Sequence, residues 1–240
     1  MGSFRLSRAE RDLVVQQFAP QAEGGQFRTN VPNCEDGLRL STVYAPEPYA
    51  VVTEVATTRI ISPLVLARRP ETAEDNATAE TLTMFAGDVT LDDGFCPAEL
   101  NRSGLERVYI VQGRTLVSGT ELVYDNDTGL ADLSGPVRLS REAEGSGPEI
   151  LASADSLIFD VETELSTLSG SVLISSGSRI SYADSLVLDE DAGVATLRGS
   201  PARSVEGEND ISGSVLIYYL DTDDVVVEGG VSGSLELELP

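Results

Sequence analysis

One segment recurs along the second half of the chain, and its clearest copies are Ala154-Asp-Ser-Leu-Ile-Phe-Asp160 and Ala183-Asp-Ser-Leu-Val-Leu-Asp189. Looser copies flank them, as Gly119-Thr-Glu-Leu-Val-Tyr-Asp125 and Gly213-Ser-Val-Leu-Ile-Tyr-Tyr219. Each copy continues through an acidic turn and a second apolar run to a glycine. Repetition of this kind indicates one structural unit that is used several times.

The copies are regularly spaced. Their anchor leucines are separated by 35, 29 and 30 residues, and every leucine is followed 13 residues later by a glycine. These positions are Leu122, Leu157, Leu186 and Leu216, with Gly135, Gly170, Gly199 and Gly229. The chain therefore contains a repeat of about thirty residues.

The apolar runs within each unit are short and rich in β-branched and aliphatic residues. Turn clusters such as Asp125-Asn-Asp-Thr-Gly129 separate them, which is typical of hairpins. Apolar residues alternate with small or polar ones, as half-buried antiparallel strands require. The sequence predicts an all-β antiparallel fold, with each unit read as strand, turn, strand, glycine, strand.

The first half of the chain is less regular. Only one segment there has a helical pattern, because Ser7-Arg-Ala-Glu10 matches a capping box and Leu13, Val14, Gln17 and Phe18 follow on one helical face. We expect residues 1–36 to form a cap segment that allows a short helix. Residues 37–240 then form the β domain, with degenerate repeats over 37–114 and clear repeats over 115–233.

The charge of the chain is strongly acidic. The 240 residues hold 40 Asp and Glu against 16 basic residues, all arginine, for a net charge of -24. Residues 121–240 alone hold 24 acids against 5 arginines. Nucleic acid is therefore excluded as a partner, since polyphosphate binding needs a basic surface. The absence of histidine excludes the Ser-His and Cys-His catalytic pairs.

The repeat resembles the LptA/OstA-like family of periplasmic lipopolysaccharide-transport bridge proteins. The closest residues are Ala154–Asp160, Leu168-Ser-Gly-Ser-Val172, Ile180–Asp189 and Ile211 through Val231. The resemblance implies a β-jellyroll of OstA-like type, whose apolar interior shelters acyl chains and whose edge strands join molecules head to tail. It also implies a non-enzymatic role in the periplasm or cell envelope, with a signal segment removed and with lipopolysaccharide, another amphiphilic lipid, or envelope-transport and outer-membrane proteins as partners.

The inward-facing repeat positions are the candidates for lining such a groove: Leu157, Phe159, Ile174, Ile180, Tyr182, Leu186, Leu188, Leu216 and Tyr218. The C-terminal segment Ser234-Leu-Glu-Leu-Glu-Leu239 alternates strictly and is a candidate edge strand for assembly, through Leu235, Leu237 and Leu239. A filled interior is as compatible with the residues as an open groove. The alternative function is therefore a structural envelope scaffold that binds other proteins through its sheet edges, and a repeat-built carbohydrate-active enzyme is a third.

A phosphorylated lipid is an unexpected cargo for so acidic a half-domain. Three explanations are open: the charges lie on the outer face, divalent cations bridge them to the lipid, or the cargo is not lipopolysaccharide. We favour the first.

The remaining candidate sites are few. Cys34 and Cys96 lie in turn-rich contexts and could form a disulfide, with two free thiols as the alternative. The acidic turns could bind calcium but lack the glutamate of an EF-hand loop, so solvated hairpin turns are favoured. Asp155 and Asp184 recur with the repeat, which argues for a structural rather than a catalytic role. The sequence thus predicts no catalytic residue, no metal and no cofactor.

Overall fold

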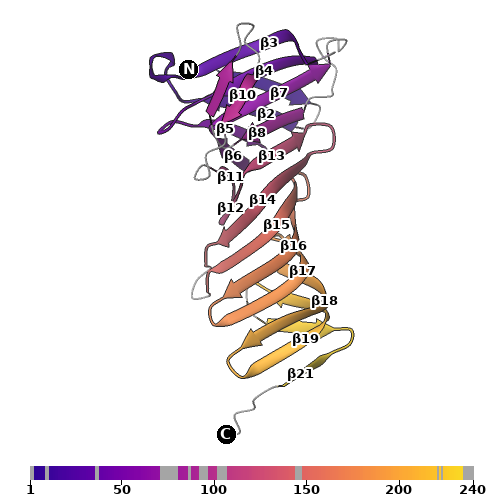
Figure 1. Ribbon diagram of the computed structural model, residues 1–240. Coiled ribbons are helices and arrows are strands. Elements are labelled where there is room, and N and C mark those ends of the chain that lie inside the picture. The colour runs from indigo at the N-terminus through magenta and orange to yellow at the C-terminus, as the bar shows by residue number, and fades with distance from the viewer. Residues whose placement is uncertain are drawn as a thin grey trace. The chain divides into compact units, whose positions relative to one another are not determined.

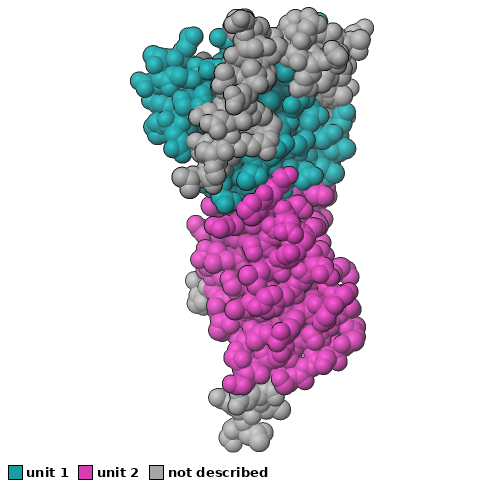
Figure 2. All heavy atoms as spheres, viewed as in Figure 1, with its two compact units in different colours: residues 1–113, 118–133 teal, residues 114–117, 134–240 magenta. Residues whose placement is uncertain are grey.

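The computed structural model describes residues 3–8, 11–35, 38–70, 81–85, 88–91, 97–101, 107–143, 148–220, 222 and 224–234. The chain divides into two compact units, one of residues 1–113 and 118–133 and the other of residues 114–117 and 134–240 (Figure 2). Strands make up most of both, as the sequence predicted, and no helix among the described residues is long and apolar enough to cross a membrane. The predicted division at residues 36 and 37 stays a prediction.

The first unit contains β1 (Ser3–Arg8), β2 (Arg11–Gln17), β3 (Gln26–Glu35), β4 (Leu38–Tyr44), β5 (Val51–Val55), β6 (Thr58–Ser62), β7 (Leu64–Pro70), β8 (Thr81–Phe85), β9 (Asp88–Leu91), β10 (Pro97–Asn101), β11 (Val108–Gln112) and β13 (Glu121–Asp125). The second contains β15 (Ile150–Asp160), β16 (Leu165–Ser176), β17 (Arg179–Asp189), β18 (Val194–Glu206), β19 (Asn209–Tyr219), β20 (Asp224–Glu228) and β21 (Ser232–Ser234). Both units share β12 (Thr115–Gly119) and β14 (Leu130–Arg141).

The first unit is built from two antiparallel runs of strands. One pairs β1, β2, β5, β6 and β11 in that order, and the other pairs β3, β4, β7, β8 and β13. In β7 the successive residues 64–67 are all buried, so this strand is covered on both faces. A strand covered on both faces needs apolar residues at consecutive positions, which is why Leu64-Val-Leu-Ala67 does not alternate.

The prediction of a possible short helix near the N-terminus is wrong. Residues 11–17 form strand β2, which pairs with β1 on one side and β5 on the other. Leu13 and Val15 are both fully buried on one face of this strand. A ten-residue helix is marginal on its own, whereas the strand satisfies its backbone on two neighbours. The only helical turn described nearby is the 3-10 turn Gln21–Glu23.

The second unit is a meander of long antiparallel strands. Figure 1 shows β15, β16, β17, β18 and β19 following one another in chain order, and each is paired with the next. Each strand is 11 to 13 residues long. The strands are longer than the sequence predicted because the chain continues in strand conformation through Gly170 and Gly199 instead of ending there.

Irregularities near these glycines exchange the faces of several strands. In β17 the register against β18 shifts between Tyr182 and Ser185. Ser181 is buried before the shift, whereas Leu186 and Leu188 are buried after it. Because side chains alternate with a period of two, a change of phase by one residue moves the following residues to the other face.

The acidic turns cap the hairpins. The side-chain oxygen Oδ1 of Asp125 accepts hydrogen bonds from the backbone N–H groups of Asp127 and Thr128, at 2.8 and 2.9 Å. Asp160 and Asp189 accept equivalent bonds from the residues two or three positions later. These carboxylates stabilise turns, which supports the hairpin interpretation of the acidic clusters. The described part of the chain contains no group of three or more Cys, Asp and Glu side chains arranged to hold a metal ion.

Candidate functional site

A groove opens in the second unit. It encloses about 680 Å³, counting the space that is continuous with solvent. Its lining residues are Leu139, Arg141, Pro148, Ile150, Ala152, Ile174, Ser176, Arg179, Ser181, Leu186, Leu188, Ala195, Leu197, Tyr218, Tyr219 and Leu220. The lining is mostly aliphatic, as is usual for sites that bind apolar ligands.

Residues from both sides of the register shifts line the groove. Leu186, Leu188 and Leu197 come from the segments on one side. Ala152 and Ser181 come from the segments on the other side. Short side chains such as Ala152 and Ser181 leave space in this lining that larger side chains would fill.

The position of the register shift also explains where the predicted groove residues lie. Ile174, Leu186, Leu188 and Tyr218 line the groove. Three others, Leu157, Phe159 and Leu216, are buried but do not line it. Ile180 and Tyr182 instead lie on the opposite face, 42% and 47% exposed. An unbroken period of two would place these two residues on the same face as Leu186 and Leu188. The irregularity in β17 interrupts that period.

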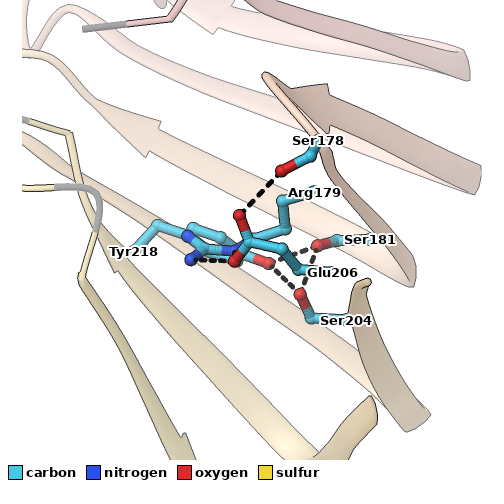
Figure 3. Close-up of polar contacts among 6 residues, drawn as sticks. All are labelled: Ser178, Arg179, Ser181, Ser204, Glu206 and Tyr218. Atoms are coloured by element: carbon cyan, nitrogen blue, oxygen red, sulfur yellow. Dashed lines mark hydrogen bonds and ion pairs between the residues drawn. The ribbon is translucent and has the colours of Figure 1, made fainter. Parts of the chain in front are cut away.

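A cluster of hydroxyl groups lies at one part of the groove lining. Ser181 Oγ is 3.1 Å from Ser204 Oγ, and the hydroxyl of Tyr218 donates to Ser204 Oγ at 2.9 Å (Figure 3). The hydroxyls of Ser181 and Tyr218 are also in hydrogen-bond contact. All three residues are buried, so each hydroxyl is satisfied by the others rather than by water.

An ion pair adjoins the hydroxyl cluster. Arg179 contacts Glu206 Oε2 through Nη2 at 2.8 Å and through Nε at 3.2 Å, and Ser178 donates to the other carboxylate oxygen at 2.9 Å (Figure 3). The hydrogen bond from Ser178, followed by that from Arg179, lowers the pKa of Glu206. The Arg179 guanidinium also lies 5.7 Å from the centre of the Tyr218 ring, within cation–π distance.

A second arginine of the lining is more deeply buried. Arg141 is 5% exposed, and its Nε is 3.8 Å from Glu190 Oε2. Glu190 also accepts a short hydrogen bond from the hydroxyl of Thr115. Sequence reasoning missed both groove arginines. Arg141 had a usable signal, since it continues the alternation of the buried residues Val137 and Leu139 in β14.

Among the described residues, the groove lining contains no aspartate or glutamate, although the chain carries 40 of them. Arg141 and Arg179 are the charged residues of this described lining. The expectation that the acidic residues of the second half lie on an outer face stays a prediction.

Two predicted features lie outside the described residues. The candidate edge-strand residues Leu235, Leu237 and Leu239 are among them. So are Cys96 and the side chain of Cys34, and the predicted disulfide therefore stays a prediction.

Residues 103–194 match the family model described as the LptA/(LptD N-terminal domain) LPS transport protein. This segment of the chain is LptA/OstA-like. The matched segment includes β15, β16 and β17 and many of the groove residues, Arg141 and Arg179 among them. The resemblance seen in the sequence repeat is thereby confirmed.

The chain was also compared with curated proteins and with solved structures. No curated protein matches the chain. LptH of Pseudomonas aeruginosa, the LptA homologous periplasmic component of its lipopolysaccharide transport device, is similar with 12% sequence identity and a TM-score of 0.44. That similarity covers 51% of this chain and 95% of LptH.

Proposed function

We propose that the chain is a non-enzymatic carrier or bridge for lipopolysaccharide or another acyl lipid in the periplasm or cell envelope. The observation that carries the proposal is the groove of the second unit, which is lined mainly by aliphatic side chains, has no acidic residue in its described lining and lies largely within the LptA/OstA-like segment. Leu139, Ile174, Leu186 and Leu188 form the contact surface for acyl chains.

Burial of acyl chains supplies the binding free energy. Each methylene group removed from water contributes roughly 0.8 kcal/mol. A chain of about ten methylenes therefore gains on the order of 8 kcal/mol, before the cost of ordering the chain is subtracted. Such binding needs no catalytic group and no cofactor.

Assembly through strand edges is the second part of the proposal. In the second unit, β20 and β21 pair with β19 at the end of the meander. The alternating residues Leu235, Leu237 and Leu239 follow directly after β21. A strand at this position can add to a sheet edge of another molecule, either a second copy or another envelope-transport protein.

Native mass spectrometry of the full chain after gentle extraction tests lipid carriage. We expect acyl lipid to co-purify with the wild-type protein. The Ala152→Phe variant should lose it, because Ala152 is 6% exposed and lines the groove, so that a ring at this position would fill the space proposed for the acyl chain. Leu151→Phe is the matched control, since the neighbouring residue is 46% exposed on the opposite face.

A lipid-free wild-type protein that still assembles would contradict carriage and favour the envelope scaffold. Equal lipid occupancy in the Ala152→Phe and Leu151→Phe variants would place the lipid elsewhere. Thermal unfolding of both variants shows whether Ala152→Phe retains the fold.

A further inference from the structure

Arg141 is a buried cation on the wall of an otherwise apolar groove. It is the last residue of β14 and lies on the buried face of that strand, after Val137 and Leu139. Its side chain is 6% exposed, while leucines from β14 and β17 line the same groove. Placing a guanidinium there is costly unless its charge is compensated.

Within the described part of the chain, the positive charge of Arg141 is only partly compensated by other side chains. Its one ion pair, with Glu190, spans 3.8 Å between Arg141 Nε and Glu190 Oε2, which is too long for a hydrogen bond. Arg141 Nε is buried and has no hydrogen-bond partner among the described residues. A guanidinium offers five N–H donors and accepts no hydrogen bond. The group is therefore able to take a second anion from the groove side.

The surroundings favour an anion from a ligand rather than from the protein. No acidic side chain of the described residues lines the groove, and Arg179 adds a second positive charge to the lining. In a groove with low-dielectric walls, a cation attracts an anion more strongly than it does at an exposed surface. An anion held here would lie beside Leu139, Leu186 and Leu188, which offer an apolar surface to an attached chain.

We propose that Arg141 is the headgroup-binding residue of the groove and recognises the phosphate or carboxylate group of an acyl amphiphile. The inference rests on the proposed lipid carriage and extends it to the class of headgroup. It also accounts for the binding of an anionic lipid by an acidic half-domain: the ligand's charge meets arginine inside the groove, and the described lining of the groove holds no acidic residue. Guanidinium groups bind carboxylate and phosphate through paired hydrogen bonds, which gives the site its selectivity.

Isothermal titration calorimetry of the full chain tests the proposal with three probes below their micelle-forming concentrations. Dodecyl phosphate and dodecanoate are anionic, whereas dodecyl maltoside carries a chain of the same length on a neutral headgroup. The wild-type protein should bind both anionic probes more tightly than the maltoside. Tighter binding of dodecyl phosphate would identify phosphate as the preferred group, and equal binding would show that any oxyanion suffices.

Two variants should change the affinity in opposite directions. Arg141→Met keeps most of the length of the side chain without its charge. It should lower the affinity for the two anionic probes about tenfold to a hundredfold and leave the affinity for the maltoside unchanged. Glu190→Gln removes the carboxylate that competes for Arg141 and should raise the affinity for the anionic probes. Arg203→Met is the control, because Arg203 is exposed, pairs with Asp210 and does not line the groove.

The outcomes separate the two proposals. If no probe binds the wild-type protein, lipid carriage fails and the headgroup site fails with it. If all three probes bind with equal affinity, or if Arg141→Met lowers all three affinities equally, the proposal of lipid carriage is retained and the headgroup site is overturned. The wild-type comparison and Glu190→Gln keep the test decisive even if Arg141→Met does not fold.

Discussion

At the scale of single residues, the second unit combines an apolar groove with polar groups that bond to one another. Ser181, Ser204 and Tyr218 form a closed hydroxyl cluster, and Arg179 pairs with Glu206 beside it. Strands present these residues to one place from sequence positions up to 39 apart. Their pairing explains how buried polar side chains are accommodated in an interior built mainly of aliphatic residues.

Glu206 should make part of the protein's stability depend on pH. The hydrogen bond from Ser178 and that from Arg179 lower its pKa below the ordinary value of 4.5. The free energy that Glu206 contributes is therefore fully present above pH 4.5 and is lost as the pH falls through its lowered pKa. Because the carboxylate is partly exposed, the Glu206→Gln variant should lose about 1 kcal/mol or less at neutral pH.

Chemical denaturation at a series of pH values measures this effect. The difference in unfolding free energy between the wild-type protein and Glu206→Gln should shrink as the medium becomes more acidic. Glu228→Gln, at an exposed position in β20, serves as the comparison variant. A difference between wild type and Glu206→Gln that stays constant down to the acidic limit would contradict the assignment.

At the scale of the elements, the repeat glycines allow the long strands to continue past an irregularity. Gly170 lies in β16 with φ = +78°, where the register shifts between Ser169 and Val172. A Cβ atom added at Gly170 would lie 2.3 Å from Asp155 Oδ2. Two features therefore favour glycine at this position. The backbone is left-handed, and Asp155 of β15 lies too close for a side chain.

Gly170→Ala should therefore destabilise the protein more than a glycine substitution that meets only the backbone requirement. Gly207 provides that comparison, because its φ is +58° and an added Cβ would meet nothing within 4 Å. We expect Gly207→Ala to cost roughly 1–2 kcal/mol for the left-handed backbone. Gly170→Ala should cost more than this by at least about 1 kcal/mol, because it also forces β15 and β16 apart. Urea denaturation of both variants measures the difference, and equal costs would show that the contact with Asp155 relaxes freely.

At the scale of the whole molecule, the dominant property is the net charge of -24. Like charges repel one another across the folded protein, and the repulsion falls when the chain expands. Added salt shortens the range of this repulsion to about 8 Å at physiological ionic strength. The folded state should therefore gain stability from salt at neutral pH.

Thermal unfolding at low and high concentrations of sodium chloride tests this expectation. The midpoint temperature should rise with salt at pH 7, and the rise should disappear near the isoelectric point of about 4.1. Sodium chloride is preferred to sulfate, because sulfate also strengthens apolar burial. A midpoint that falls with salt at pH 7 would mean that attractive ion pairs such as Arg203–Asp210 outweigh the net repulsion.

The sequence by itself determined the strand repeat, the antiparallel all-β fold, the acidic turns and the family resemblance. These follow from local spacing, because leucines, glycines and turn-forming aspartates recur at fixed separations along the chain. Alternation also placed Leu186 and Leu188 on one face of their strand, and both are buried.

Only the tertiary structure decided which residues meet inside the second unit. In the sequence, the alternation of apolar and polar residues continues from Ile180 to Leu188 without a break. The irregularity in β17 moves the residues that follow it to the other face of the strand, so Ile180 and Tyr182 are exposed. The N-terminal segment formed a strand because β1 and β5 lie beside it, which its own residues do not reveal. Arg141 and Glu190 are 49 positions apart, and their approach depends on how β14 and the end of β17 fold together. Register and long-range pairing are set by contacts between distant strands, so neither can be read from spacing along one strand.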